Sequence, residues 1–484
     1  MQKLTREQFL AIYNAGPDAV IDLIEQLIES NQNLAQQVQS LQRRVSTLEE
    51  QLAQNSRNSN KPPSSDGLKR PTRTLRKASQ RRVGGQKGHE GHTLKRVAHP
   101  NKTIRCTVEI CHHCGKSLKS APVQKYESRQ VFDIRPVKLE VTEYQAEVKQ
   151  CTHCNCLNQA AFPERVSQPV QYGSGLKAQL VYLMNQHLLP YERTAEIIYD
   201  IYGHRLSTGS LVNLNQTCYQ ALEVPEAVIK NQITNSKVVH FDETGGRVEV
   251  QTKWLHTAST RNFTWYGFHR RRGTGAMNDA NIWPLFKGIA VHDHWKSYFN
   301  YDCQHALCNA HHLRELIFIS EQKHQSWAQE MMVLLLEIKA SVEKAREDGF
   351  DTLDKKLLTA FENKYSQILE RGFEVNPEID SRRKRKKRTK AQNLLHRLKN
   401  YPRETLAFMY DFDIPFDNNL AERDIRMVKV QQKISGCFRT SAGANIFCRI
   451  RGFISTAKKQ NCNILQAIQS AMDGKPMLTY LMAE

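Results

Sequence analysis

Residues 237–269, KVVHFDETGGRVEVQTKWLHTASTRNFTWYGFH, hold short β-branched and aromatic runs divided by turn residues. A similar run, GIAVHDHW, follows at 288–295. Runs of this kind predict β-strands. Residues with helical spacing lie on both sides, GLKAQLVYLMNQHLLPYERTAEIIYDIYG at 175–203 and SWAQEMMVLLLEIKASVEKAREDG at 326–349. The sequence therefore predicts an α/β core whose strands are concentrated in one stretch and whose helices flank it.

The composition indicates a basic chain of several domains. Its 484 residues, 40% of them hydrophobic, suffice for two or three globular units. Lys and Arg number 69 against 49 Asp and Glu, a net charge of +20, which favours a polyanionic partner such as nucleic acid. The longest apolar run, MMVLLL at 331–336, is far shorter than the ~20 residues of a membrane span. No apolar core of a signal peptide follows the first charges, so a cytoplasmic location without membrane attachment is expected.

The N-terminal segment carries a heptad repeat. Leu27, Leu34, Leu41 and Leu48 lie seven residues apart, and a companion series of mostly β-branched residues includes Asn31. Leu at d with β-branched residues at a favours a parallel two-stranded coiled coil, and an Asn at a sets its register. A single amphipathic helix folded onto its own domain is the alternative. The coiled coil would make the protein a homodimer.

Two stretches are strongly basic. Fourteen Lys and Arg face two acidic residues between positions 57 and 105, in a segment rich in Asn, Ser, Pro and Gly. SRRKRKKRTK at 381–390 has eight basic residues in ten. Both are predicted to contact DNA phosphates. A solvated tether and a solvated surface are the alternatives.

Two cysteine pairs predict a structural zinc site. The cysteines are Cys111, Cys114, Cys151 and Cys154, in two CxxC pairs with 36 residues between them. Two such knuckles supply the four soft ligands that tetrahedral Zn²⁺ prefers. A redox pair is a weaker interpretation. Because Cys106 and Cys156 lie nearby, the choice of four ligands stays open.

Three carboxylates have the context of a catalytic cluster. Asp242 is expected to end the strand VVHFD before a turn at 244–246, and Asp293 ends the strand GIAVHD. Glu422 lies on a predicted helix within PFDNNLAERDIRMVKV, for which Asp417 is the expected N-cap. The positive charge of two Mg²⁺ ions would balance the negative charges of three carboxylates and one scissile phosphate. Such a pair can activate an attacking hydroxyl and stabilise a leaving oxygen.

Other acidic residues compete with this assignment. An Asp at a strand end often only caps a turn, and the nearby alternatives are Glu243, Asp302, Asp417 and Asp424. Asp417 is already explained by its expected role as the N-cap of the helix. Strand alternation puts Glu243 on the face opposite Asp242, and Asp302 follows no clear strand end.

Taken together, the motifs resemble a known family. They are NSRNSNKPPSSDG, GGQKGHEGH, the two cysteine knuckles, HFDET, HDHW, CNAHHLREL and FDNNLAERDIRMVKVQQK, in this order along nearly the whole chain. The chain is similar to the transposases of the insertion-sequence 66 family, bacterial enzymes of the DDE type. The resemblance implies a ribonuclease-H-like catalytic core with a helical insertion, a small zinc-ribbon domain and an N-terminal coiled-coil helix. It implies that Asp242, Asp293 and Glu422 are the catalytic residues and hold two Mg²⁺ or Mn²⁺ ions.

The resemblance also assigns supporting residues. Asn418, Asn419 and Arg423 are expected to orient the helix of the catalytic Glu or to contact the substrate phosphate. Cys308 and His311 match the family pattern beside the active site. A metal role for this pair needs two further ligands that the sequence does not indicate, so a core Cys and a hydrogen-bonded His are expected.

The function expected is that of a DNA transposase. It would bind the terminal inverted repeats of its element, cleave to free 3′-OH groups and join these to target DNA. A catalytically silent DNA-binding repressor and a structure-specific nuclease without strand transfer are the alternatives. Expected partners are duplex DNA, a second copy of the chain and small accessory proteins of the element, with the bacterial nucleoid as the place of binding.

The predicted segments are 1–55 (coiled coil), 56–105 (basic arm), 106–165 (zinc domain), 166–235 (helical DNA-binding region), 236–310 (core, first part), 311–410 (helical insertion) and 411–484 (core, C-terminal helices).

Overall fold

The computed structural model describes residues 5–59, 94–134, 137–377 and 388–476. The chain divides into two compact units, one of residues 1–74, 173–190 and 212–484 and the other of residues 75–172 and 191–211. The strongly basic stretches predicted to contact DNA fall mostly at 60–93 and 378–387, outside the described residues. No helix in the described part of the chain combines the length and apolarity of a membrane span.

The N-terminal segment is helical, as its periodicity predicts. Its helices are α1 (Arg6–Asn14) and α2 (Pro17–Leu52). Pro at the first turn of α2 fits because its missing N–H has no partner in a helix there. The leucines of the repeat remain exposed, with Leu34 at 54% and Leu41 at 60%. Among the described residues, the helix thus carries an apolar seam that is left exposed.

A five-stranded mixed sheet forms the centre of the larger unit, so the predicted α/β class is confirmed. Its strands are β3 (Val238–Val248), β4 (Gln251–Ser259), β5 (Thr264–His269), β6 (Ile289–His292) and β7 (Gln304–Leu307). Their order is β5-β4-β3-β6-β7. The first three are antiparallel neighbours, while β6 runs parallel to both β3 and β7. The central strand β3 therefore joins the antiparallel half to the parallel half.

The expected turn at 244–246 is wrong, because β3 continues through it to Val248. The chain reverses instead at Glu249 and Val250, whose φ angles of 53° and 64° suit a two-residue hairpin turn. Gly246 has another role. A Cβ there would lie 2.7 Å from the Phe268 ring, so the glycine permits close packing on the sheet. Asp242 consequently lies within a long strand rather than at its end.

Two of the three C-terminal helices pack directly on the antiparallel half of the sheet, and the third packs on other helices. The helices are α14 (Asn419–Ser435), α15 (Ser441–Lys459) and α16 (Ile464–Met472). α14 packs against β3 and β4, and α15 against β5. Their shared core includes Leu255, Tyr266, Ile425, Val428 and Phe447. This packing fixes α14 along the central strand.

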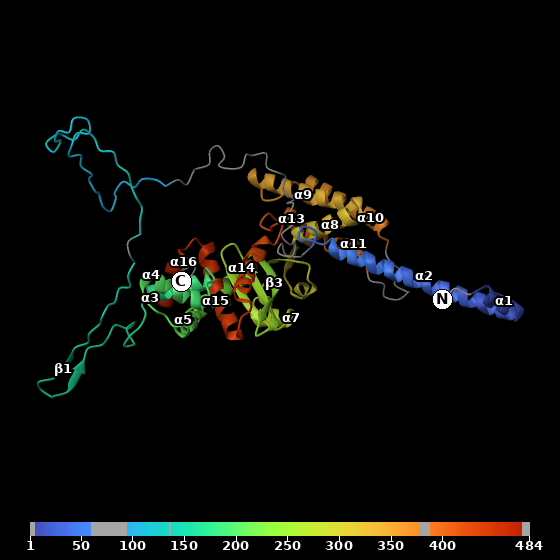
Figure 1. The fold of residues 1–484 in the computed structure, drawn as a ribbon, viewed down its shortest axis with the longest axis horizontal. Helices are drawn as coiled ribbons and strands as arrows, with labels where there is room; N and C mark the ends of the chain where they lie inside the picture. The colour runs from blue at the N-terminus through green and yellow to red at the C-terminus, as the bar shows by residue number, and fades with distance from the viewer. Residues whose placement is uncertain (1–4, 60–93, 135–136, 378–387, 477–484) are drawn as a thin grey trace. The chain divides into compact units, whose positions relative to one another are not determined.

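A second group of helices lies between β7 and α14 in the sequence. These are α8 (Asn309–Lys323), α9 (Ser326–Glu347), α10 (Lys355–Val375), α11 (Lys390–Asn400), α12 (Pro402–Thr405) and α13 (Ala407–Tyr410). Figure 1 shows α8, α9, α10 and α11 packed together. Their core, built around Trp327, Leu334 and Leu394, continues to Val291 of β6. The helices that the sequence predicts between the second Asp and the Glu are therefore present.

The remaining helices precede the sheet or connect its strands. They are α3 (Ser174–Asn185), α4 (Tyr191–Tyr202), α5 (Thr208–Ala221), α6 (Glu223–Thr234), α7 (Thr274–Ala280) and the 3₁₀ helix η2 (Lys296–Asn300). Ser207, directly before α5, accepts a bond from the Ser210 N–H (3.0 Å). In the smaller unit, β1 (Val148–Gln150) and β2 (Leu157–Gln159) form an antiparallel hairpin.

Candidate active site

Three carboxylates from distant parts of the chain come together at the sheet. Asp242 lies on β3, Asp293 directly follows β6, and Glu422 lies in the first turn of α14. Parallel pairing of His240 with Val291 sets an offset that brings Asp242 level with Asp293. The pKa of Asp242 is raised well above its usual value, first by burial and then by the charges of Glu243, Asp293 and Glu422. The predicted trio is therefore brought close enough for its members to interact.

Asn418 holds the start of α14 against the sheet. Its buried side chain donates through Nδ2 to Phe241 O (2.8 Å), and its Oδ1 lies 2.9 Å from His240 Nδ1. Its backbone N–H donates to Cys308 Sγ (3.1 Å). These bonds tie the helix to β3 and to the residue after β7, and so determine where Glu422 points.

The predicted cap of this helix is wrong by one residue. Asn418, not Asp417, occupies the N-cap position, and it makes no side-chain cap bond. Asp417 Oδ1 instead accepts from the Asn419 N–H (3.0 Å). The bonds of Asn418 to β3 hold its side chain on the sheet, and α14 begins one residue later than its local sequence predicts.

Asp293 and Glu422 keep oxygen atoms available to a cation. Asp293 Oδ1 accepts from the Trp295 N–H (2.9 Å), which orients the carboxylate. Glu422 Oε1 is buried and has no hydrogen-bond partner. A buried oxygen without a partner is costly unless another group, such as a metal ion, satisfies it. Together with the raised pKa of Asp242, the oxygen-rich set fits Mg²⁺, which prefers hard oxygen ligands.

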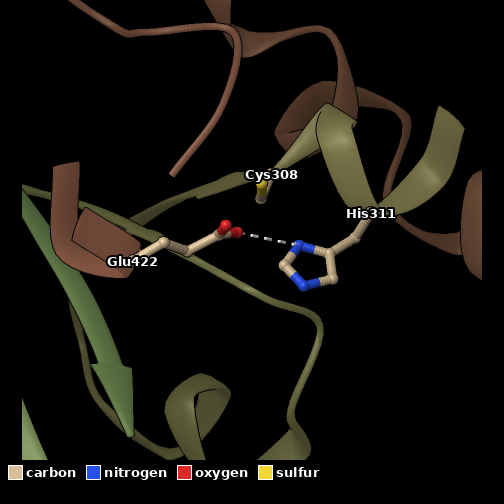
Figure 2. A group of neighbouring side chains, drawn as sticks. All are labelled: Cys308, His311 and Glu422. Atoms are coloured by element: carbon tan, nitrogen blue, oxygen red, sulfur yellow. Dashed lines mark ion pairs between the residues drawn. The ribbon is translucent and has the colours of Figure 1, made fainter. Parts of the chain in front are cut away.

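Side chains from the start of α8 surround Glu422. His311 Nδ1 lies 3.9 Å from Glu422 Oε1, and an Arg314 nitrogen lies 3.6 Å from Oε2. Figure 2 shows the His311 ring facing the Glu422 carboxylate, with the Cys308 thiol beside them. Burial lowers the pKa of His311 to about 4, with the nearby Arg314 charge as the next cause. His311 is therefore neutral at pH 7 and able to accept or bind through Nδ1.

Arg314 is not among the residues that the sequence motifs predict for the site. Its signal is the helical spacing within CNAHHLREL, where it lies three residues after His311 and so shares a helix face with it. Arg272 was missed as well, since nothing in its local sequence indicates that it contacts Glu243.

The competing acidic residues have other partners. Glu243 receives bonds from Arg272 (Nε to Oε1, 2.8 Å) and from the Tyr298 hydroxyl at Oε2. Asp424 Oδ2 accepts from Lys459, Ser259 and Thr264. The Asp302 side chain is fully exposed beside Lys287. These contacts give Glu243 and Asp424 structural roles and place Asp302 in solvent.

The two other predicted contact residues lie on the surface of α14. Asn419 and Arg423 are exposed, and Arg423 Nε donates to Asn419 O (3.3 Å). They lie three residues before and one residue after Glu422. Their exposed polar groups are thus available to a phosphate near the carboxylates.

Each cysteine pair forms the same backbone knuckle. In the first, the Cys111 N–H donates to Lys116 O and the Gly115 N–H to Cys111 O, both at 2.9 Å. The second repeats both bonds around Cys151, with Asn155 in the position of Gly115. Gly115 and Asn155 both have positive φ, 71° and 57°. The knuckles are therefore equivalent, although their sequences differ.

The knuckles favour thiolates. Backbone N–H groups, first that of Cys114 and then that of His113, lower the pKa of Cys111, and Cys154 and His153 do the same for Cys151. This chemistry fits zinc, which binds the deprotonated thiol. Among the described residues, however, the four thiols do not converge to within 4.8 Å of one another.

Comparison with known proteins finds three family matches. Residues 169–446, more than half of the chain, match the Transposase IS66 family. Residues 109–155 match the zinc-finger binding domain of transposase IS66, and residues 15–95 match a family of unknown function. No curated protein matches the chain. The zinc-finger match spans both cysteine knuckles.

Proposed function

Because the chain belongs to the IS66 family of transposases, we propose that it cleaves the ends of its own element and joins the freed 3′-OH groups to target DNA. The observation that carries this proposal is the register that sets Asp242 beside Asp293 on neighbouring strands, with Glu422 near enough for its charge to raise the pKa of Asp242. The sheet order, with the first Asp on the central strand, supports a ribonuclease-H-like core. The long helical group between β7 and α14 fits the insertion expected there.

The three carboxylates would hold two Mg²⁺ or Mn²⁺ ions. Asp242 on β3, Asp293 after β6 and Glu422 on α14 would supply the carboxylate oxygens that bind them. When bound, such a pair activates the attacking hydroxyl and stabilises the leaving oxygen. Within the chain, Asn418 positions Glu422, and the Trp295 N–H orients Asp293. Water would attack phosphorus in the cleavage step, and the freed 3′-OH would attack phosphorus in the joining step. Both steps are in-line displacements, so one site would serve both.

Surface residues of α14 would receive the DNA strand. Asn419 and Arg423 are exposed beside Glu422 and would contact the phosphate next to the scissile bond. Contacts of this kind position the backbone without reading its sequence. The zinc domain and the helices of residues 174–234 would recognise the terminal repeats.

The cysteine knuckles would bind one structural Zn²⁺ through Cys111, Cys114, Cys151 and Cys154. The equivalent backbone bonds and the lowered pKa values of Cys111 and Cys151 support this set over Cys106 and Cys156. Zinc binding would bring the knuckles together, because metal binding and folding are coupled in small zinc modules.

The seam of α2 would pair two copies of the chain. Leu34 and Leu41 expose more than half of their surface, and a parallel coiled coil would bury both against a second copy. A dimer suits an enzyme that must hold two DNA ends. Action on chromosomal DNA places the enzyme at the bacterial nucleoid, with accessory proteins of the element as further partners.

End cleavage tests the proposal. Purified protein is mixed with labelled DNA carrying the element's ends, with Mg²⁺, Mn²⁺ or Ca²⁺, and with wild type beside Asp242→Asn. Cleavage and joining in Mg²⁺ or Mn²⁺, lost in Asp242→Asn and kept in the exposed control Asp302→Asn, are expected. Cleavage without joined products would favour the nuclease. End binding without cleavage, even with the accessory proteins added, would favour the repressor, and cleavage by Asp242→Asn would refute the assignment.

A further inference from the structure

Cys308, His311 and Glu422 form a second cluster of metal-binding groups. One ligand atom from each lies within 4.8 Å of the other two, and no other set of three or more His, Cys, Asp or Glu residues in the described segments does so. Figure 2 shows the three side chains converging from the starts of α8 and α14. Only Glu422 among them belongs to the proposed Mg²⁺ site.

We propose that Cys308 Sγ, His311 Nδ1 and a Glu422 oxygen bind a thiophilic divalent cation of the Zn²⁺ class, and that this ion competes with the Mg²⁺ pair for Glu422. The binding site stands on its own geometry, while the competition rests on the function proposed above. The third ligand comes from the far end of the helical insertion, 111 residues after His311, which explains why the sequence shows only two.

The separations fit a tetrahedral ion. Zinc bonds of about 2.0–2.3 Å place neighbouring ligands about 3.4–3.8 Å apart around a tetrahedron. His311 Nδ1 and Glu422 Oε1 are already 3.9 Å apart. Both atoms are buried and lack a hydrogen-bond partner. Two buried polar atoms that face each other without hydrogen-bond partners are the arrangement expected of two ligands of one metal ion.

The backbone holds the ligands in place. The Cys308 N–H donates to His292 O (3.0 Å), which continues the pairing of β7 with β6, and the His311 N–H donates to Cys308 O (3.2 Å). Glu422 is held through Asn418, whose N–H also donates to Cys308 Sγ (3.1 Å). The three ligands therefore come from one connected scaffold.

The donor set selects the class of ion. A thiolate, an imidazole and one carboxylate are borderline-soft ligands that suit Zn²⁺, Co²⁺ or Cd²⁺, whereas Mg²⁺ binds oxygen ligands and water. Cys308 is the N-cap residue of α8, and Glu422 lies in the first turn of α14. Burial and then the Glu422 charge raise the pKa of the Cys308 thiol, so a bound ion would have to displace its proton. Three protein ligands leave a fourth position for water.

Sharing Glu422 makes the two sites antagonistic. A carboxylate drawn toward Cys308 and His311 no longer completes the Mg²⁺ set with Asp242 and Asp293. The Arg314 contact at Oε2 (3.6 Å) already holds Glu422 on the α8 side. A Zn²⁺-class ion would therefore inhibit end cleavage, and would do so through Cys308 and His311.

The binding test uses the full-length protein with its cysteine knuckles filled with Zn²⁺. Co²⁺ is then added, and the thiolate-to-metal charge-transfer absorption is recorded for wild type, Cys308→Ser and His311→Gln. Wild type is expected to bind one Co²⁺ with this absorption, and both variants to lose it. Cys218→Ser, the same change at another buried cysteine, is the matched control and should retain it. Thermal unfolding of each variant shows that it is folded.

The inhibition test measures end cleavage in Mg²⁺ with increasing Zn²⁺, each variant being compared with its own rate without Zn²⁺. The half-inhibiting Zn²⁺ concentration is expected to rise at least tenfold in Cys308→Ser and to stay unchanged in Cys218→Ser. Absence of a Cys308-dependent Co²⁺ band would overturn the site. Equal Zn²⁺ inhibition of Cys308→Ser and wild type would overturn the competition. A wild type that binds Co²⁺ but never cleaves DNA would refute the proposed function and leave the site standing.

Discussion

Replacing Asp242 by Asn should stabilise the metal-free protein at neutral pH. Burial and the charges of Glu243, Asp293 and Glu422 raise the pKa of Asp242 well above its usual value. An acid whose pKa is raised by folding contributes stability at low pH and loses it as the pH rises. Asn removes the charge and keeps an oxygen that can accept from the Glu243 N–H, now 2.9 Å from Asp242 Oδ1.

The magnitude follows from the proton equilibrium. Each pKa unit corresponds to about 1.4 kcal/mol, and the ordinary Asp pKa of about 3.9 lies roughly three units below pH 7. The buried Asp242 can take up a proton at pH 7 for about 4 kcal/mol, so its charge cannot destabilise the fold by more than that. A single carboxylate about 5 Å away would contribute about 3 kcal/mol at an effective dielectric of 20. We expect Asp242→Asn to raise the free energy of unfolding by about 1–4 kcal/mol at pH 7.

Thermal and urea unfolding in EDTA measure the difference across pH 4 to 8. It should vanish near pH 4 and grow with pH, and each 1 kcal/mol should raise Tm by about 2–4 °C. Mg²⁺ should stabilise wild type and not the variant, by about 2.7 kcal/mol at 100 times Kd.

The matched control carries the same substitution at Asp424. That carboxylate accepts from Lys459 Nζ (2.8 Å), so Asp424→Asn should lower the free energy of unfolding by about 1–3 kcal/mol. If Asp242→Asn were instead destabilising at pH 7 in EDTA, or if its effect did not change with pH, the inference that the carboxylates repel one another would fail.

Other variants test the supporting parts of the structure. Asn418→Ala should lower the free energy of unfolding by about 2 kcal/mol and slow end cleavage, because the start of α14 loses its bonds to β3; the exposed Asn419→Ala should leave unfolding within about 0.5 kcal/mol. Leu34→Lys should dissociate the dimer in sedimentation equilibrium because it puts a charge in the seam, while Gln36→Lys, outside the seam, should not; a dimer that survives Leu34→Lys argues against the coiled coil. Cys111→Ser should remove one zinc per chain by elemental analysis and abolish binding of the terminal repeats, and unchanged zinc content would exclude this cysteine as a ligand.

Local patterns were sufficient for much of the architecture. The heptad spacing of Leu34 and Leu41 predicts a helix with an apolar seam, and α2 is such a helix; its pairing with a second copy stays a prediction. The spacing of Cys111 and Cys114 likewise predicts a knuckle whose backbone bonds are present. These features depend on residues close in sequence. Periodicity indicates which face of a helix is apolar, and spacing indicates which thiols are adjacent.

The course of β3 depended on distant residues. Gly245 and Gly246 predict a turn by their composition, yet the strand passes through them. Gly246 instead lies so close to the Phe268 ring that a Cβ would not fit. Composition alone does not distinguish a glycine needed for a turn from one needed for contact.

The assembly of the site was decided only by the tertiary structure. The sequence and its family resemblance predict a trio of carboxylates, but not that Arg272 and Tyr298 occupy both oxygens of Glu243. Nor did they indicate that Glu422 comes to face His311 across the helical insertion. Such contacts arise from the pairing of β3 with β6 and from the packing of α14 on the sheet, and no periodicity along the chain records them. Residue type and spacing determined what each segment could do, and long-range packing determined which side chains meet.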